Sequence, residues 1–462
     1  MIPQRLAAIL APGAPARDLA ARFRSAGKSF YVVGGSVRDA LLDRPSADLD
    51  FTTDARPEEI EEIVGGWASG LYLAGKAFGT IGVVKDGGTL EITTHRSEIY
   101  RDDSRKPHVT YSDDITEDLS RRDFSVNAMA IEVPVADDET PVMVDPFGGL
   151  ADLHAEILRT PLDPEISFGD DPLRMLRLFR FMSTIGFVPD QSALDAVRTM
   201  SGRLQIVSAE RIRVEFDKLM TGKHVGPALW GVVETGLAAE FIPEIPALAL
   251  EEDPVHRHKD VLAHTIAVVE KTSDRPELRL AALFHDIGKP ATREFGPDGV
   301  TFHHHEVVGA RMTRHRMGEL RYSTKVIDAV AELVFLHMRP HTFKMGWTDS
   351  AVRRYVRDAG PQLEDLNELV RCDVTTRNRK RARAISRRID ELEERIVELR
   401  AQEELDALRP PIDGNQVMDH LGIPPGPTVG AAMRMLLERR IEDGPYTEAE
   451  AFTMLEEWKR AE

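Results

Sequence analysis

The stretch KSFYVVGGSVRDALLD (28–43), followed by ADLDFTT (47–53), decides the fold of the N-terminal part of this chain. The apolar run before Gly34-Gly35 predicts a strand, and the glycine pair predicts a tight turn. The spacing of apolar residues after the turn predicts a helix, and the alternation in 47–53 predicts a second strand. The order strand, glycine turn, helix, strand predicts a mixed α/β structure for this region.

Two carboxylates follow the glycine turn. Asp48 and Asp50 are two residues apart on the second predicted strand, so their side chains point to one face of the sheet. Carboxylate oxygens suit Mg²⁺, and two such ions about 3.5–4 Å apart can activate a hydroxyl and stabilise a pyrophosphate leaving group. Gly34 and Gly35 let a phosphate approach the backbone at a helix N-terminus, and Arg38 adds a charged donor. Taken alone, the glycine pair is more simply interpreted as an ordinary turn, and the aspartate pair as a solvated strand edge.

The pattern changes near residue 150. Before it, residues 79–96 predict a hairpin around Asp86-Gly87-Gly88. After it, apolar residues recur every three or four positions, as in 173–187, which predicts helices. A Pro-rich stretch over 241–258 marks a boundary, and 381–406 predicts a long, highly charged helix without a clear apolar seam.

Length and composition narrow the class of protein. The 462 residues suggest about three domains at roughly 150 residues each. The 42% of hydrophobic residues excludes a disordered chain and a small disulfide scaffold. No stretch approaches the roughly 20 apolar residues of a membrane span, so we expect no membrane contact. The single cysteine, Cys372, fits a reducing compartment, and with no secretory apolar core near the N-terminus we expect a cytoplasmic protein.

The charge of the chain is unevenly distributed. The net charge is −18, which by itself argues against a large polyanionic partner. However, the run RNRKRARAISRRID (377–390) contains seven Arg or Lys, and DPLRMLRLFR (171–180) contains three evenly spaced Arg. Nucleic-acid binding depends on where charge lies rather than on its sum, so these runs keep an RNA partner open. A solvated helix face is the simpler interpretation of any one of them.

The ordered motifs of the first half resemble a known family. GGSVRD (34–39) followed by DLDF (48–51) is similar to the start of class II tRNA nucleotidyltransferases and of the related bacterial poly(A) polymerases. The resemblance continues, in the family's order, through GKAFGTIGVV (75–84), LEITTHR (90–96), DLSRRDFSVNAMA (118–130), DPFGGLADL (145–153), DDPLRMLRLFR (170–180) and SAERIRVEF (208–216).

The resemblance implies a fold and its division into domains. It implies an α+β nucleotidyltransferase head, a small mixed sheet with flanking helices, followed by all-α neck, HD and tail domains. We expect the head over 1–150, the neck with the nucleotide-template helix over 151–250, the HD domain over 251–375 and the tail over 376–462.

The resemblance also implies roles for residues of the head. Asp48 and Asp50 would hold the catalytic Mg²⁺ ions, and Glu91 on a neighbouring strand is a candidate third carboxylate. Arg122 and Asp123 would contact the ribose and phosphates of the incoming nucleotide. A surface salt-bridge cluster is the alternative explanation of these two residues.

In the neck, the resemblance makes one helix the reader of the base. Asp171 and Arg174 would mimic a Watson–Crick partner for C and A, since an aspartate accepts and an arginine donates hydrogen bonds at a base edge. Arg177 and Arg180 would hold phosphates or support this template. The family motif usually begins Glu-Asp, whereas here it begins Asp170-Asp171, which keeps the base-reading aspartate. Taken alone, this helix would be interpreted as capped by Asp171 with a solvated arginine face.

A second group of motifs resembles the HD phosphohydrolase superfamily. HDIGKP (285–290) lies within the order H…HD…H…H…D, formed by His264, His285, Asp286, His305, His337 and Asp373. Imidazole and carboxylate ligands suit a transition metal, which can activate water for phosphoester hydrolysis. Lys289 is placed to steady a phosphate. Of the three consecutive histidines that end at His305, only the last fits the pattern.

The implied function is template-independent addition of CCA to the 3′ end of tRNA from CTP and ATP. In the family the C-terminal helices hold tRNA, and the basic run is the best candidate phosphate track, with Arg377, Arg379, Lys380, Arg381 and Arg383. Rivals with the same chemistry are a poly(A) polymerase and enzymes that add only CC or only A. A rival of another class is an HD phosphohydrolase with an RNA-binding head. A scaffold with two inactive sites is the weakest interpretation, because the aspartates of both sites are intact.

Overall fold

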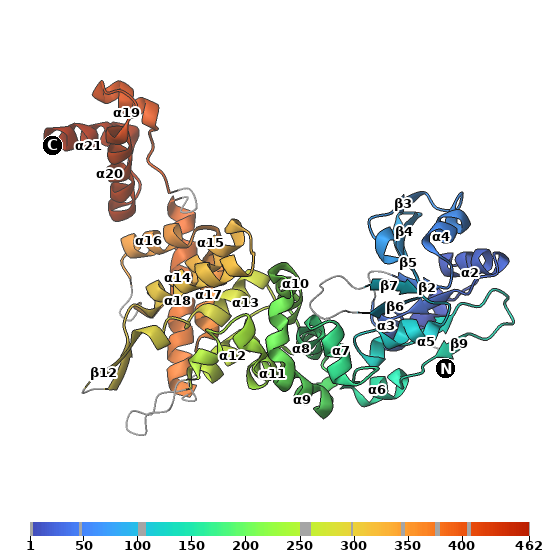
Figure 1. The fold of residues 1–462 in the computed structure, drawn as a ribbon. Coiled ribbons are helices and arrows are strands. Elements are labelled where there is room, and N and C mark those ends of the chain that lie inside the picture. Colours follow the sequence, from blue (N-terminus) through green and yellow to red (C-terminus); the bar gives the residue numbers. More distant parts are fainter. Residues whose placement is uncertain are drawn as a thin grey trace. The chain divides into compact units, whose positions relative to one another are not determined.

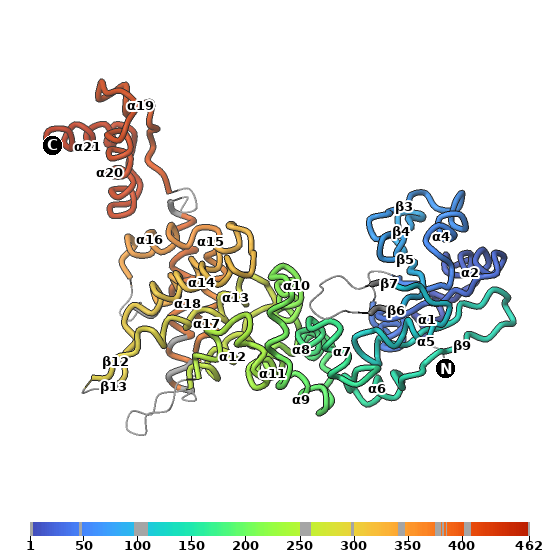
Figure 2. Tube along the Cα trace, in the orientation of Figure 1, coloured from blue at the N-terminus to red at the C-terminus, as the bar shows by residue number. Residues whose placement is uncertain are grey.

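The computed structural model describes residues 3–45, 49–99, 108–249, 260–296, 299–342, 347–374, 379–403 and 408–461 (Figure 1). The chain forms two compact units, residues 1–243 and 244–462. The finer divisions expected at residues 150 and 375 stay predictions. The trace in Figure 2 shows the strands of the large sheet in the blue to cyan part of the chain and mainly helices from green onward.

A seven-stranded mixed sheet is the centre of the N-terminal unit. Its strand order is β3-β4-β5-β2-β1-β8-β9, and every neighbouring pair is antiparallel except β2 and β5. The β4–β5 hairpin turns at Asp86-Gly87, which confirms the predicted hairpin. The strands are β1 (Tyr31–Val33), β2 (Leu49–Thr53), β3 (Gly70–Tyr72), β4 (Thr80–Lys85), β5 (Gly88–Thr94), β8 (Ala130–Glu132) and β9 (Val142–Val144).

Helices pack on one face of this sheet through an aromatic stack. Phe23 of α2 stacks on Phe30 with ring centroids 4.7 Å apart, and Phe30 stacks on Phe51 of β2 at 4.8 Å. Since side chains alternate along a strand, Asp50 next to Phe51 faces the other side of the sheet. The helices here are α1 (Gln4–Ile9), α2 (Pro15–Ser25), α3 (Gly35–Leu41), α4 (Pro57–Val64), α5 (Ile115–Ser120) and α6 (Gly149–Ala155), with η1 (Lys76–Phe78), η2 (Ser125–Asn127) and the ribbon β6 (Arg96–Ile99)–β7 (His108–Tyr111).

The rest of the N-terminal unit is almost entirely helical. The helix α8 packs on α10 and α11, and Met175, Leu178 and Phe179 are fully buried there, which confirms the apolar stripe expected from the sequence. These elements are α7 (Pro164–Asp170), α8 (Leu173–Ile185), α9 (Gln191–Met200), α10 (Ala209–Met220), α11 (Val225–Glu234), η3 (Ser201–Ile206), η4 (Leu237–Glu240) and the parallel pair β10 (Ile157–Leu158) and β11 (Val188–Pro189).

In its described residues, the C-terminal unit is helical apart from one hairpin. Its first part contains η5 (Pro246–Leu248), α12 (Val261–Lys271), α13 (Pro276–Phe284), η6 (Pro290–Thr292), β12 (Arg293–Gly296), β13 (Gly299–Phe302), α14 (His305–Glu319), α15 (Thr324–Leu336), η7 (Arg339–Thr342), α16 (Asp349–Ala359), η8 (Gly360–Gln362) and α17 (Leu363–Cys372). Its last part contains α18 (Arg379–Glu403), α19 (Gly414–Leu421), α20 (Pro427–Asp443) and α21 (Glu448–Ala461). Among the described residues, none of the helices combines the length and apolar character that crossing a bilayer requires.

The long charged helix was predicted correctly, but the absence of an apolar seam was wrong. One residue per turn of α18 is buried, at Ile389, Leu392, Ile396 and Leu399. The spacing of three, four and three residues makes a seam one side chain wide, which the surrounding charged residues obscure in the sequence. Lys380 and Arg383, predicted to contact RNA, are exposed near the start of this helix. Arg377 and the side chains of Arg379 and Arg381 lie outside the described residues.

Candidate functional site

The glycine turn and the RRDF motif, far apart in the sequence, meet in the N-terminal unit. Gly34 has φ +73°, a backbone conformation that favours glycine. A Cβ atom at Gly34 would lie 2.6 Å from Nη1 of Arg122, so only glycine lets this guanidinium lie against the bend. The structure therefore brings two of the predicted nucleotide-binding motifs together.

The carboxylate of Asp50 is carried by β2 on the face opposite the aromatic stack. The parallel register pairs Asp50 with Glu91 of β5, so their side chains are neighbours on that face. The backbone N–H of Asp50 donates to Oγ of Ser36 at 2.9 Å, which ties the start of β2 to the first turn of α3. Asp48 lies outside the described residues. The described part of the chain thus offers Asp50 and Glu91 as adjacent oxygen donors for a metal.

A buried aspartate that the sequence analysis missed organises the RRDF motif. Asp118 has a fully buried side chain and accepts hydrogen bonds from Arg121 at 2.6 Å and Arg122 at 3.2 Å. Burial opposes ionisation of Asp118, but the two guanidinium groups outweigh it and lower its pKa to about 2. The sequence signal was the spacing of three and four residues from Asp118 to the arginines, which on a helical turn places them side by side.

Asp123 is the centre of a hydrogen-bond network with the helix α8. Its Oδ1 accepts from Nδ2 of Asn127 at 2.8 Å, and its Oδ2 accepts from Nε of Arg177 at 2.9 Å. Burial opposes ionisation of Asp123, but Arg177 outweighs it and holds the pKa of this carboxyl well below its usual range. Oδ1 of Asn127 accepts in turn from Nη1 of Arg38 at 2.6 Å. Arg38, predicted to bind phosphate, is thus a buried member of this network and also pairs with Asp39 at 2.8 Å.

A second carboxylate missed by the sequence analysis holds the arginine stripe. Glu215 of α10 is buried and lies 3.2 Å from Nη1 of Arg177 and 2.9 Å from Nε of Arg180. The guanidinium of Arg180 also lies 3.8 Å from the centre of the Phe181 ring. Burial, together with the nearby charge of Arg177, lowers the pKa of Arg180 to about 10. The two arginines are therefore fixed by protein contacts in this structure.

The two residues predicted to read the base are also engaged by protein groups. Oδ2 of Asp171 lies 2.8 Å from Nη2 of Arg211, and its Oδ1 accepts from the backbone N–H of Leu173 at 3.2 Å. Arg174 is buried, donates to Oγ of Ser167 at 2.9 Å, and also donates to the backbone carbonyl of Arg121. Arg174 therefore links the RRDF motif to the helices that follow it.

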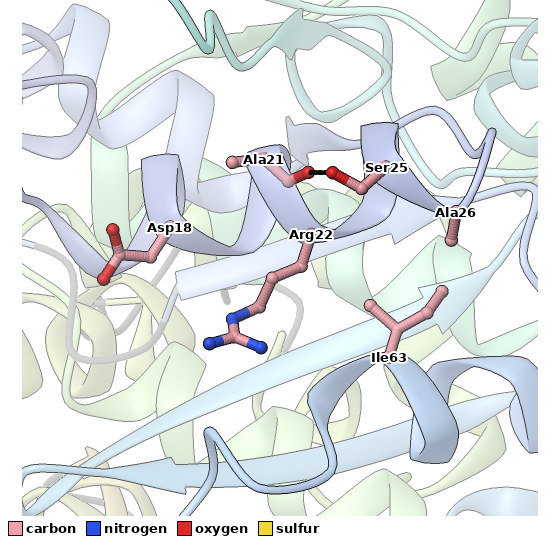
Figure 3. A pocket seen from close by; sticks show the side chains of 6 residues that line it. All are labelled: Asp18, Ala21, Arg22, Ser25, Ala26 and Ile63. Atoms are coloured by element: carbon pink, nitrogen blue, oxygen red, sulfur yellow. Dashed lines mark hydrogen bonds between the residues drawn. The ribbon is translucent and has the colours of Figure 1, made fainter.

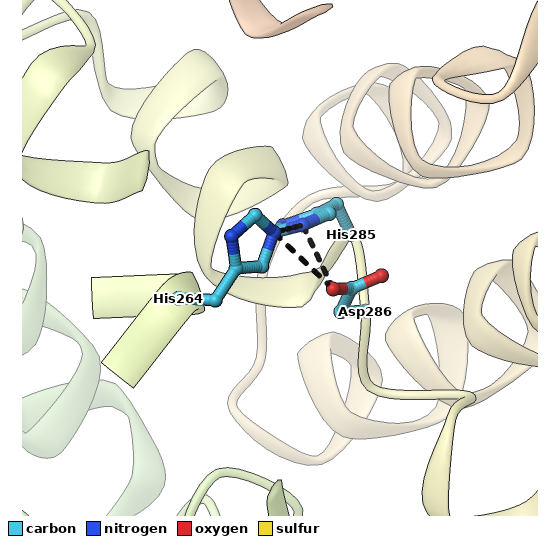
Figure 4. A group of neighbouring side chains, drawn as sticks. All are labelled: His264, His285 and Asp286. Atoms are coloured by element: carbon cyan, nitrogen blue, oxygen red, sulfur yellow. Dashed lines mark hydrogen bonds and ion pairs between the residues drawn. The ribbon is translucent and has the colours of Figure 1, made fainter. Parts of the chain in front are cut away.

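The histidines and aspartates of the second predicted site converge in the C-terminal unit. His264 lies on α12, His285 and Asp286 follow α13, and His305 begins α14, while His337 and Asp373 directly follow α15 and α17. Figure 4 shows His264 and His285 turned toward Asp286. Nε2 of His285 lies 3.1 Å from Oδ2 of Asp286 and 3.3 Å from Nε2 of His264, and His264 lies 2.9 Å from Asp373.

Asp286 joins two ligand groups. Its Oδ2 faces His264 and His285, while its Oδ1 lies 3.5 Å from Nε2 of His305, which in turn lies 3.3 Å from Nε2 of His337. Among the described residues, these are the two groups of at least three His, Cys, Asp or Glu side chains whose ligand atoms lie within 4.8 Å of one another. His303 and His304 are exposed, whereas His305 is buried and lies in the cluster.

The ring orientations of the histidines suit metal binding. Nδ1 of His285, His305 and His337 contacts a backbone carbonyl three residues earlier, at 2.7, 2.9 and 2.6 Å. A proton on Nδ1 leaves the lone pair of Nε2 directed inward, as a metal ligand needs. Burial lowers the pKa of His264 and His305, and burial with the nearby His285 lowers that of His337 to about 3, so these rings are neutral at pH 7.

The ligand cluster is closed by a glycine and a lysine of the HDIGKP motif. A Cβ atom at Gly288 would lie 2.2 Å from the carbonyl oxygen of His305, so glycine is what lets α14 approach the motif. Nζ of Lys289 lies 2.6 Å from Oδ2 of Asp286. The ammonium group of Lys289 is thus paired with the carboxylate that the two ligand groups share. The imidazole and carboxylate donors of these groups are of the kinds that bind transition metals.

A surface hollow of about 700 Å³ lies between α2 and α4, away from the residues described above. Figure 3 shows its lining, where Ser25 donates a hydrogen bond to the carbonyl of Ala21. The hollow contains none of the predicted site residues, and it belongs to the helices rather than to the Asp50 face of the sheet.

Three families of known domains match the chain. Residues 30–159 match the "Poly A polymerase head domain", residues 186–248 the "Probable RNA and SrmB- binding site of polymerase A" and residues 261–397 the "HD domain". The last match includes all six histidines and aspartates of the convergent cluster.

Curated proteins similar to the chain share its length as well as its motifs. An A-adding tRNA nucleotidyltransferase of Deinococcus radiodurans is 32% identical over 442 residues, 92% of this chain and 95% of that protein. The chain belongs to the tRNA nucleotidyltransferase family. Another member, a CCA-adding enzyme of Streptococcus thermophilus, is 29% identical over 94% of this chain and 93% of its own length. A third, the CCA-adding enzyme of Bacillus licheniformis, is 42% identical over 46% of this chain, and the chain spans about half (51%) of that relative.

A solved structure of the family has the same fold. The CCA-adding enzyme of Bacillus stearothermophilus in complex with CTP superimposes with a TM-score of 0.69 at 25% identity, over 96% of this chain and 97% of that one. The family match and the observed sheet with helical regions after it confirm the predicted fold class, an α+β head followed by helical domains.

Proposed function

We propose that this chain adds CCA to the 3′ end of tRNA, using CTP and ATP without a nucleic-acid template. The observation that carries the proposal is the meeting of the Gly34 bend with Arg122 beside the Asp50 strand, because a triphosphate substrate needs these groups in one place. The similarity to CCA-adding enzymes, one of them solved with CTP, supports the choice of substrates.

The proposed head chemistry is nucleotidyl transfer. The tRNA 3′ oxygen forms a bond to the α-phosphorus, the bond from that phosphorus to the β-phosphate oxygen breaks, and the hydroxyl proton leaves to solvent as pyrophosphate departs. Asp50, with Asp48 by family resemblance, would hold Mg²⁺. When bound, this ion would activate the hydroxyl and stabilise the negative charge of the pyrophosphate leaving group. Glu91 lies beside Asp50 as a further oxygen donor.

The protein groups around this chemistry would bind and orient the nucleotide. Arg122 lies against the glycine bend and would bind the ribose and phosphates there. Asp123, held by Arg177, would help to orient the nucleotide beside it. C and A each present an exocyclic amino group beside a ring nitrogen that accepts a hydrogen bond. Asp171 would accept from the amino group, and Arg174 would donate to the ring nitrogen. For this reading, Arg174 has to exchange its contacts with Ser167 and Arg121 for the base.

The test is a product-length assay with tRNA transcripts that end before the first C, after one C and after two. We expect CCA to be completed with CTP and ATP, and Asp50→Asn to abolish addition. Asp43→Asn, a neighbouring exposed aspartate, serves as the matched control and should keep activity. If the protein adds a single A, and only to the transcript that ends in CC, it is an A-adding enzyme like the Deinococcus relative. If it adds long A tails, it is a poly(A) polymerase.

A second proposed activity belongs to the HD site. Two ligand groups that share Asp286 fit two transition-metal ions, which would supply an activated water for hydrolysis of a phosphoester. Lys289, which pairs with Asp286 at 2.6 Å, would steady the phosphate by exchanging this contact for a phosphate oxygen. His305→Ala should lower both the bound metal and any phosphodiesterase or phosphatase activity, while His304→Ala, exposed beside it, should change neither. Equal metal content in the two variants would exclude His305 as a ligand.

A further inference from the structure

The base-reading carboxylate of the proposed template is held at both oxygens. Oδ1 of Asp171 accepts from the backbone N–H of Leu173 at 3.2 Å, and Oδ2 lies 2.8 Å from Nη2 of Arg211. The side chain of Asp171 is 20% exposed and that of Arg211 is 54% exposed, so the pair lies at the surface of the site rather than in the core. Without Arg211, the single bond from Leu173 would leave the carboxylate free to turn.

Arg211 belongs to a charge pattern on α10 that complements α8. Arg211 and Glu215 are four residues apart and therefore lie one helical turn from each other on the same face. Arg211 meets the aspartate before α8, and Glu215 meets Arg177 and Arg180 on that helix. The helix α10 thus opposes Asp171, Arg177 and Arg180 of the proposed template with side chains of the opposite charge.

The orientation of Asp171 decides which bases it tolerates. The exocyclic amino groups of C and A donate to a carboxylate, whereas U and G present a carbonyl oxygen at the same place and repel it. A carboxylate oxygen has two lone-pair sites, so Oδ2 can keep Arg211 while it accepts from the base. U or G would fit only if the carboxylate turned aside.

We infer that Arg211 is a positioning residue for base selection: it locks the carboxylate of Asp171 in the orientation that accepts an amino group and rejects a carbonyl. The inference rests on the proposed function, because it takes Asp171 as the base reader. Arg211 does not touch the reacting atoms, so its loss should change the choice of nucleotide more than the turnover of the correct one.

The test compares wild type, Arg211→Ala, Arg211→Lys and the matched control Arg198→Ala, which removes an exposed arginine paired with Asp195 on α9. Each protein extends tRNA ending before the first C with CTP or UTP, and tRNA ending in CC with ATP or GTP. The side chain of Arg211 is about half exposed, so its pair with Asp171 should be as weak as a typical surface ion pair. Its loss should therefore change the selectivity between nucleotides by about fivefold.

We expect the ratio of kcat/KM for CTP over UTP to fall about fivefold in Arg211→Ala, with a higher KM for CTP and an almost unchanged kcat. Arg211→Lys should restore part of the ratio, and Arg198→Ala should match wild type. Equal selectivity in Arg211→Ala and Arg198→Ala would overturn the inference, as would a lower KM for CTP at unchanged selectivity. If Arg211→Ala does not fold, as judged by thermal melting, Arg211→Lys decides. Absence of any addition by wild type would instead refute the proposed function.

Discussion

Replacing Asp118 by Asn tests whether this buried carboxylate stabilises the RRDF motif by its charge. The pKa of Asp118 is about 2 instead of 3.8, because Arg121 and Arg122 outweigh the effect of burial. At about 1.4 kcal/mol per pH unit, this difference corresponds to about 2 kcal/mol at neutral pH. Asparagine keeps the shape and loses this charge. The side chains of the two arginines are 17% and 19% exposed, so water can solvate their charges once the carboxylate is gone. The loss of folding free energy should therefore stay at about 2 kcal/mol.

The assay is thermal unfolding of the full-length protein, with hydrogen exchange in α5 to report on the N-terminal unit. For a unit of this size, about 2 kcal/mol lowers Tm by about 4–8 °C. Asp113→Asn, at an aspartate that is 80% exposed and pairs with Arg56, is the control and should shift Tm by less than about 1 °C.

The pH dependence gives a second check. The folded pKa of Asp118 is depressed, so its contribution is complete above an unfolded pKa of about 4 and is lost as the pH falls toward about 2. The difference between wild type and Asp118→Asn should therefore be constant from pH 8 to 5 and shrink below pH 4. A variant that melts within a degree of wild type at pH 7, or a difference that grows on acidification, would refute the reasoning.

Three further substitutions test other contacts of the fold. Gly288→Ala places a Cβ 2.2 Å from the carbonyl of His305, so we expect a loss of about 1–3 kcal/mol and less bound metal; unchanged metal content would contradict a close packing of α14. Glu215→Gln leaves Arg177 and Arg180 without the carboxylate that they share, and urea unfolding should show a loss of about 3 kcal/mol in stability. An unchanged stability would mean that Asp123 alone balances the charge of the two arginines. Arg353→Ala removes a buried donor to the carbonyls of Ile441 and Glu442, at a cost of about 2 kcal/mol, and trypsin should cut the tail helices faster; equal cleavage rates would argue against this contact as their anchor.

Much of the molecule was predictable from the sequence because the signals are local. The strand, glycine turn and helix around Gly34, and the hairpin at Asp86-Gly87, follow from alternation and turn chemistry over a few residues. The resemblance of the ordered histidines and Asp286 to the HD superfamily implied a common site, and the structure brings these side chains together. The binding of metal there stays a prediction.

The amino-acid sequence by itself determined the class of fold, the order of its parts and the candidate chemistry, since these depend on short patterns and on motifs in a fixed order. Only the tertiary structure decided which charges are partners. Glu215 with the α8 stripe and Arg211 with Asp171 became apparent only there, as did the burial of Arg38 and Asp118. An ion pair depends on the distance between two side-chain ends, and for residues many positions apart that distance is set by how helices and strands pack.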